Sequence, residues 1–125
     1  MRFMMIMIPN ISEEDWPTDA AALAELDAVA EMGKYNEELT KAGVLLGADG
    51  LQPTRMGARV AFAGGKPSVT DGPFTEAKEL IGGYWLIQAR SKEEAVQWAS
   101  RCPANDGDVI EVRQVYDPSD AETAA

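Results

Sequence analysis

The sequence of 125 residues contains no histidine and only one cysteine, Cys102. Without histidine the chain lacks the commonest general base near neutral pH. A single thiol cannot form an internal disulfide, and there is no ligand set for zinc, haem or an iron–sulfur cluster. We therefore expect a reducing compartment, an inert Cys102 thiol, no metal and no other cofactor.

Positive charge is also scarce, with 11 lysines and arginines against 21 aspartates and glutamates and a net charge of −10. Such a chain repels nucleic-acid phosphates and anionic lipids, which argues against direct nucleic-acid binding and against a membrane role. The apolar run 3–8 closes at Pro9 and is far shorter than the roughly 20 residues that span a bilayer. We interpret it as a buried strand and expect a cytoplasmic protein.

The hydrophobic pattern predicts strands, helices and one hairpin. Segments 2–8 and 84–89 are apolar on both faces or nearly so, which predicts two central strands. A helix over about 20–42 is expected, with Gly33 close to the sheet. Its predicted apolar stripe consists of Leu26, Val29, Met32, Gly33 and Leu39. The other predicted elements are a strand from Val44, a hairpin of 59–63 and 66–70 around Gly64-Gly65, a helix after the capping box 91–94, and a strand over 109–116.

This order predicts an α+β, ferredoxin-like antiparallel sheet with two helices on one face and an inserted β-hairpin. We expect a single domain over 1–117 and a flexible acidic tail over 118–125. Two helices cover only one face of such a sheet, although both central strands are apolar on both faces. A homodimer that packs the second faces together is therefore predicted.

One run interrupts the regular elements, Asp71-Gly72-Pro73-Phe74-Thr75-Glu76-Ala77-Lys78-Glu79. With Gly82-Gly83-Tyr84 and Glu111-Val112-Arg113, it resembles the DGPF branch of the YCII-related proteins. Further matches lie at 36–39, 42–47 and 50–53. The resemblance implies a bacterial protein that forms a dimeric α+β barrel, and some relatives resemble partners encoded beside extracytoplasmic-function sigma factors.

The sequence departs from that family at two places. The wider group is often credited with a histidine–aspartate pair in its cleft, and this chain has no histidine. Relatives also tend to place a basic or aromatic residue before the glycine that starts the final strand, where this chain has Asn105-Asp106-Gly107. The family's chemistry therefore does not transfer whole to this sequence.

Within the run, Asp71 is the candidate catalytic group, as a general base or ligand anchor. The alternative is an Asx-turn in which its carboxylate binds turn amides. We expect Gly72 to supply unusual backbone angles, Pro73 to fix the turn, and Phe74 to plug a core or interface. Lys78 is a candidate anion contact or simply a surface charge, and Arg55 or Arg59 is a candidate carboxylate clamp.

Other candidates lie on the regular elements. Asn36 falls in the apolar stripe of the first helix, so its amide must face either the sheet or a cavity. Glu111 and Arg113 share one face of the last strand, as an ion pair or as a pocket lining. Tyr84 and Gln88 share a face of the neighbouring central strand and are predicted to complete a polar pocket with them. Trp16 is expected to fasten its loop to the core.

These observations leave two functions open. The first is a ligand-binding or regulatory module that binds a small molecule or a protein. The second is a small-molecule enzyme with Asp71 as acid–base group, Lys78 or an arginine as anion contact and Asn36 as orienting amide. We favour the binding module, because no histidine, metal or cofactor motif is present.

Overall fold

The computed structural model describes residues 1–24, 28–74 and 80–118, so most of the predicted tail and the stripe residue Leu26 lie outside the described residues. The strands are β1 (Arg2–Ile8), β2 (Leu45–Gly50), β3 (Ala58–Ala63), β4 (Lys66–Asp71), β5 (Gly83–Gln88) and β6 (Val109–Gln114). The helices are α1 (Ala20–Ala24), α2 (Ala28–Lys41) and α3 (Lys92–Ser100), with 3-10 turns η1 (Glu13–Asp15) and η2 (Thr54–Met56). Among the described residues, no helix is both long and apolar enough to cross a membrane.

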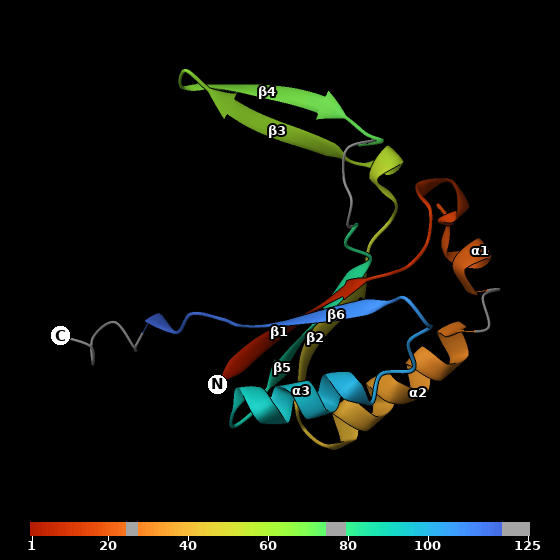
Figure 1. The fold of residues 1–125 in the computed structure, drawn as a ribbon, viewed down its shortest axis with the longest axis vertical. Helices are drawn as coiled ribbons and strands as arrows, with labels where there is room; N and C mark the ends of the chain where they lie inside the picture. Colours follow the sequence, from red (N-terminus) through yellow and green to blue (C-terminus); the bar gives the residue numbers. More distant parts are fainter. Residues whose placement is uncertain (25–27, 75–79, 119–125) are drawn as a thin grey trace.

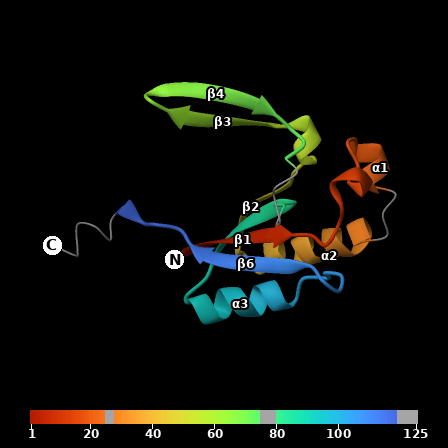
Figure 2. The same ribbon diagram turned by 45° about the horizontal axis from the view of Figure 1, so that its top comes forward.

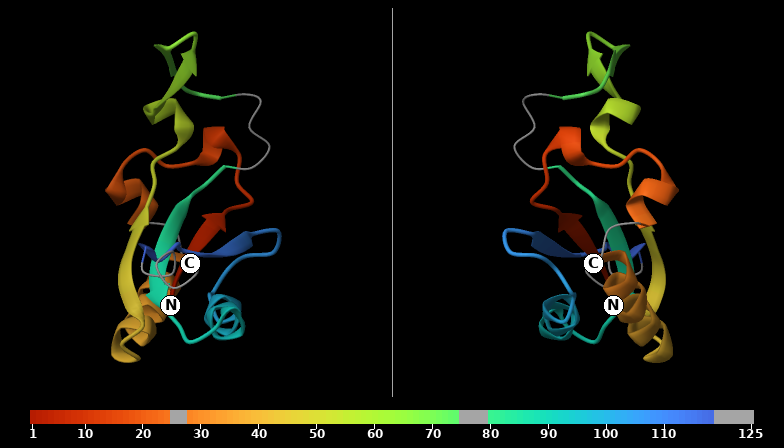
Figure 3. Two further views of the ribbon diagram at one scale, coloured as in Figure 1. Left: turned by 90° about the vertical axis from the view of Figure 1, so that its left-hand side faces the viewer. Right: turned by 90° about the vertical axis from the view of Figure 1, so that its right-hand side faces the viewer.

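Four strands form an antiparallel sheet in the order β2-β5-β1-β6. The two strands predicted to be central, β1 and β5, are central. Helices α2 and α3 lie on one face of this sheet (Figures 1 and 3). The α+β architecture is therefore confirmed and is compatible with a ferredoxin-like fold. No sheet closes into a barrel within the described part of this single chain.

The core lies between the sheet and the helices. The sheet contributes the alternate residues Phe3, Met5, Trp85 and Ile87, which are buried against Tyr35, Leu39 and Ala95 of the helices. These positions alternate along β1 and β5 because successive side chains of a strand point to opposite faces. The capping box of α3 is confirmed, since the Ser91 hydroxyl accepts a hydrogen bond from the Glu94 amide at 3.1 Å.

The predicted stripe of the first helix is partly wrong. The segment predicted as one helix over 20–42 is described as α1 and α2, with 25–27 outside the described residues. Tyr35, which the prediction omitted, is buried, whereas Val29 and Gly33 are exposed. A Cβ atom at Gly33 would meet nothing within 4 Å, so this glycine makes no close approach to the sheet. The contact face of α2 runs through Tyr35 and Leu39 instead.

Strands β3 and β4 form a separate two-stranded hairpin, residues 58–71, which we call the arm. Gly64 and Gly65 have φ values of 58° and 78°, which confirms the predicted turn, because such angles favour glycine. The arm lies on the side of the four-stranded sheet opposite α2 and α3 (Figures 1 and 2). Every residue of both arm strands is exposed.

Candidate functional site

The face of the sheet opposite α2 and α3, which we call the open face, carries polar side chains around an apolar centre. Strand pairing aligns Asp49, Tyr84, Ile6 and Glu111 in one row across all four strands. The next row consists of Gly47, Leu86, Met4 and Arg113. Neighbouring strands lie about 4.8 Å apart, so each row spans roughly 15 Å. The apolar residues Met4, Ile6 and Leu86 therefore lie on the two middle strands. Asp49 lies on the β2 edge of the sheet, and Glu111 and Arg113 lie on the β6 edge.

Polar contacts hold the two ends of these rows. The Tyr84 hydroxyl donates a hydrogen bond of 2.8 Å to Oδ2 of Asp49. This hydrogen bond and the charge of Asp49 raise the pKa of the Tyr84 hydroxyl. At the other edge, Nη1 of Arg113 lies 4.0 Å from Oε2 of Glu111. Tyr84, Glu111 and Arg113 therefore share one face, as predicted. Their strands are not neighbours, because β1 lies between β5 and β6 and places Ile6 between Tyr84 and Glu111. The expectation that Tyr84 forms one polar pocket with this pair is wrong.

A cavity of about 480 Å³ opens at the end of the open face where β1 begins. It is lined by Met1, Arg2, Leu46, Gln88, Gln114, Val115 and Asp117. Gln88 pairs with Arg2 across β5 and β1, which places both in the row beyond Leu86 and Met4. The volume is in the range of small-molecule sites, which combine apolar walls with a few polar groups. The Arg2 guanidinium also donates to the Tyr116 carbonyl at 3.4 Å.

Asn36 lies on the other side of the sheet, away from Tyr84. Its Oδ1 accepts a hydrogen bond of 2.7 Å from the indole nitrogen of Trp85, and Trp85 pairs with Met5 on the helix-covered face. Of the two locations left open for this amide, the sheet is therefore the one observed. The Tyr35 ring meets Trp85 edge-on at 5.9 Å, so Asn36 belongs to a packed aromatic cluster.

Asp71 ends β4 at the root of the arm and is exposed. Among the described residues its carboxylate accepts no hydrogen bond, and the Asx-turn interpretation is wrong. The residue two positions on is Pro73, which has no N–H to donate. The next amide, that of Phe74, donates instead to Oγ1 of Thr54 at 3.4 Å. Lys78, the predicted anion contact, lies outside the described residues.

Position 72 requires a glycine because there is no room for a side chain there, and not because of its backbone angles. It does not have a positive φ, contrary to the expectation from sequence. A Cβ atom at this position would lie 1.8 Å from the carbonyl oxygen of Thr54, which is an impossible contact. The Gly72 amide also donates to the Gly57 carbonyl at 2.9 Å. The root of the arm is thus pressed against η2.

Phe74 and Arg59 interact with each other at this root. The guanidinium carbon of Arg59 lies 4.0 Å from the centre of the Phe74 ring, a cation–π contact. Phe74 is half-buried rather than enclosed in the core. The expectation that its ring plugs the core is therefore wrong for the single chain, because the turn holds it beside the arm.

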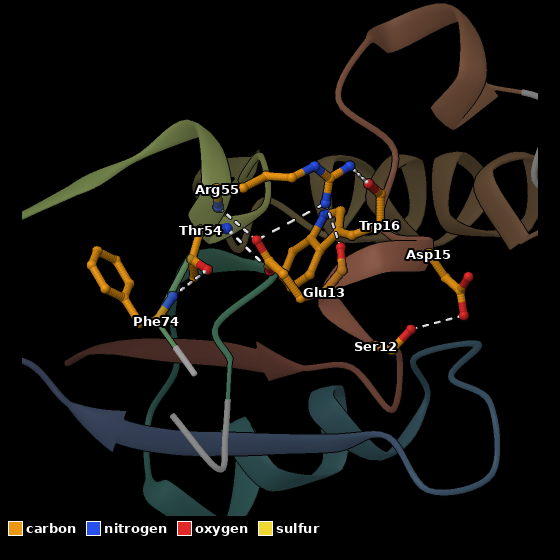
Figure 4. Close-up of polar contacts among 7 residues, drawn as sticks. All are labelled: Ser12, Glu13, Asp15, Trp16, Thr54, Arg55 and Phe74. Atoms are coloured by element: carbon orange, nitrogen blue, oxygen red, sulfur yellow. Dashed lines mark hydrogen bonds and ion pairs between the residues drawn. The ribbon is translucent and has the colours of Figure 1, made fainter. Parts of the chain in front are cut away.

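A loop cluster that the sequence did not reveal anchors η2 (Figure 4). The Glu13 carboxylate accepts hydrogen bonds from the amides of Arg55 at 2.6 Å and Thr54 at 3.3 Å. The Arg55 guanidinium donates to the carbonyls of Glu13 and Trp16. Trp16 is buried, which confirms that it fastens this loop. Arg55 is thus engaged with the chain itself rather than forming a ligand clamp.

The charge state of Glu13 follows from these contacts. Removal from water raises the pKa of its carboxyl, but the amides of Arg55 and Thr54, the Thr54 hydroxyl and the Arg55 charge together outweigh that effect and lower it. The carboxylate is therefore ionised at neutral pH. Because Glu13 and Arg55 are 42 residues apart in irregular segments, no periodicity could have paired them.

Residues 1–119 match the model of the YCII-related domain. The chain belongs to this family. It is also 37% identical over 81 residues to an uncharacterized protein of Rhizobium meliloti (strain 1021). That alignment covers 65% of this chain and 60% of the relative, so the match extends over less than two thirds of the relative's length. Family membership is consistent with the residues that carried the resemblance.

Proposed function

We propose that this YCII-related domain binds a small molecule on its open face, in an assembly in which a second copy of the chain covers that face. The observation that carries the proposal is the composition of the open face. Met4, Ile6 and Leu86 are only half-buried and form an apolar centre, although they are central residues of the sheet. Exposed apolar area of this kind, rimmed by polar groups, is typical of binding surfaces.

The polar groups indicate the class of ligand. Arg113 and Arg2 flank the apolar centre on the side of the cavity, while Tyr84 and Asp49 lie on the opposite side. An arginine favours a carboxylate or another planar anion, and the apolar centre favours a hydrocarbon or aromatic body. A small organic anion with a hydroxyl group or another hydrogen-bonding group at its far end matches this distribution.

The binding function is favoured over an Asp71-centred enzyme. Asp71 is exposed at the root of the arm, and Asn36 is engaged by Trp85 on the other face. These two residues therefore do not converge with Tyr84 and Arg113 on one concave site, as acid–base catalysis requires. We also propose that the chain belongs to the DGPF branch of the YCII-related family. The residues that give this assignment, 71–74, lie at the root of the arm.

The test is capture of ligands from a small-molecule extract. Wild-type protein is incubated with the extract, separated by gel filtration and denatured, and the released molecules are identified by mass spectrometry. We expect organic anions to be enriched with the wild type and to be lost with Arg113→Gln. The matched control is Arg90→Gln, which removes an exposed arginine that pairs with Glu94 at 3.2 Å, outside the open face.

Two outcomes would contradict the proposal. One is retention of the same molecules at the same level by Arg113→Gln and by the wild type. The other is the absence of any molecule enriched by the wild type over the denatured protein.

A further inference from the structure

The arm has one apolar and one polar face. Directly paired residues of two antiparallel strands lie on the same face. The pairs Val60 with Val69 and Phe62 with Pro67 make one face apolar over the outer part of the arm, and Ala58 with Asp71 occupies the same face at its root. The other face carries the pairs of Arg59 with Thr70, Ala61 with Ser68, and Ala63 with Lys66. The apolar face is unprotected, because Phe62, Val69 and Val60 are 78%, 67% and 52% exposed.

The chain does not bury this apolar face on itself. The root of the arm is fixed by the hydrogen bond between Gly72 and Gly57 and by the contact of Gly72 with Thr54. Glu13 in turn holds η2 in place. From this root the arm extends beside the open face and stands apart from it (Figure 2). A two-stranded hairpin alone is only marginally stable in water, so its apolar face needs a partner.

Size and charge both indicate a second copy of this chain as the partner. Each arm strand has six residues, which is about 20 Å, and the open face is roughly 15 Å wide. The arm contains Arg59 and Lys66 against Asp71, so its net charge is +1 in a chain of −10. Arg59 and Lys66 lie on the polar face of the arm, so the acidic body of another copy attracts the arm as a whole, while the apolar side chains make the contact with its open face.

We propose that the arms are exchanged in the dimer, so that the apolar face of each arm packs on the open face of the other copy and completes its ligand site with the partner's Phe62. A two-fold axis makes the exchange reciprocal, and both unprotected apolar surfaces of the chain are then buried together. The completion of the ligand site by Phe62 rests on the proposed function. The contact between the arm and the open face does not depend on it.

The first test compares two variants that add the same charge to the two faces of β3. Phe62→Glu places a carboxylate on the apolar face, and Ala61→Glu places one on the polar face. Both positions are exposed in the single chain, so neither variant should disturb its fold, which circular dichroism checks. By light scattering over a concentration series, we expect Phe62→Glu to raise the dissociation constant of the dimer at least about tenfold. Ala61→Glu should change it much less.

The second test maps the contact in a Cys102→Ala background. One chain carries Phe62→Cys, and a second chain with a different tag carries Leu86→Cys, so only contact between copies can join them. We expect the mixed disulfide to form faster than with Ala61→Cys in place of Phe62→Cys. Equal effects of the two glutamates, equal rates of crosslinking, or a monomeric wild type would each overturn the arm exchange.

These tests separate the two proposals. If Phe62→Glu leaves the dimer intact while Arg113→Gln still loses the captured molecules, the arm exchange is wrong and the binding function stands. If the arm contact is found but the wild type captures nothing, the binding function is wrong and the arm serves assembly alone.

Discussion

The two faces of the four-stranded sheet are built from alternate residues of the same strands, yet they differ in what their side chains do. On the helix-covered face, Ile87 is fully buried and Trp85 has its indole nitrogen bonded to Asn36. On the open face, the intervening residues Leu86 and Tyr84 are only half-buried, and the Tyr84 hydroxyl meets Asp49 near solvent.

This difference separates stability from recognition. Side chains packed between sheet and helices contribute free energy of folding in the single chain. Side chains on the open face retain contact with water, so their apolar area is available to a ligand or to a second copy. Substitutions that are neighbours in sequence should therefore have effects of different kinds, and the following predictions test this separation.

The largest expected effect compares two neighbours in β5. Ile87→Ala removes a fully buried side chain and should lower the free energy of unfolding by about 2–5 kcal/mol. Leu86→Ala, on the open face, should cost about 1 kcal/mol or less in a dilute sample. Urea denaturation followed by circular dichroism measures both. Equal losses at low protein concentration would mean that the two faces are packed alike.

The second prediction compares two glycines, one on each side of the sheet. Gly72→Ala at the root of the arm should cost about 1–3 kcal/mol, because the backbone of Thr54 must move away from the new methyl group. Gly33→Ala in α2 meets nothing within 4 Å and should stabilise the protein by roughly 0.5–1 kcal/mol. Thermal unfolding of the two variants should show a lower melting temperature for Gly72→Ala and a higher one for Gly33→Ala than for the wild type. A neutral Gly72→Ala would show that the arm is not pressed against η2.

These comparisons also show what the sequence can predict. Apolar residues on both faces of 2–8 and 84–89 identified the central strands, and Gly64-Gly65 identified the turn of the arm, because both signals are local. The shared face of Glu111 and Arg113 follows from a spacing of two residues in a strand. Tyr84 lies on the same face but two strands away, because β1 separates β5 from β6, and the spacing within one strand does not reveal this separation.

Contacts between irregular segments could not be predicted in this way. Glu13 caps η2 across 41 intervening residues, and the Thr54 carbonyl determines why position 72 is glycine. Neither contact leaves a periodic signal. The helix stripe was partly misplaced because the prediction counted Gly33 and omitted Tyr35. A helix turns by about 100° per residue, so these two residues lie on opposite sides of α2, and Tyr35 is on the side that meets the sheet.

The third prediction compares one hydrogen bond from each face. Asn36→Ala leaves the Trp85 indole without its acceptor in the packed interior and should cost about 1–2 kcal/mol. Tyr84→Phe removes the hydrogen bond to Asp49 near solvent and should cost much less than Asn36→Ala. Denaturant titrations measure both losses. If Tyr84→Phe proved the more costly, the open face would be contributing to folding and not only to binding.

The smallest predicted effect is a loss of folding stability at alkaline pH, and it arises from buried groups on the helix-covered side of the sheet. Burial raises the pKa of the Cys102 thiol to about 11, and burial also raises the pKa of Tyr35, whose hydroxyl donates to the Trp98 carbonyl at 2.6 Å. In the unfolded chain these groups lose their protons at lower pH, so the unfolded state binds fewer protons above about pH 9. The stability they contribute is therefore complete below that pH and is lost as pH rises.

For Cys102 the loss should be about 1 kcal/mol at pH 10, and Cys102→Ala should show a correspondingly smaller decline between pH 9 and pH 10. Equilibrium unfolding at each pH measures the decline in both proteins. The same raised pKa predicts that at pH 8 the folded wild type reacts with a thiol reagent much more slowly than the unfolded chain. Equal rates would mean that the helix-covered side admits solvent at Cys102, and the contrast between the two faces would not extend to this end of the core.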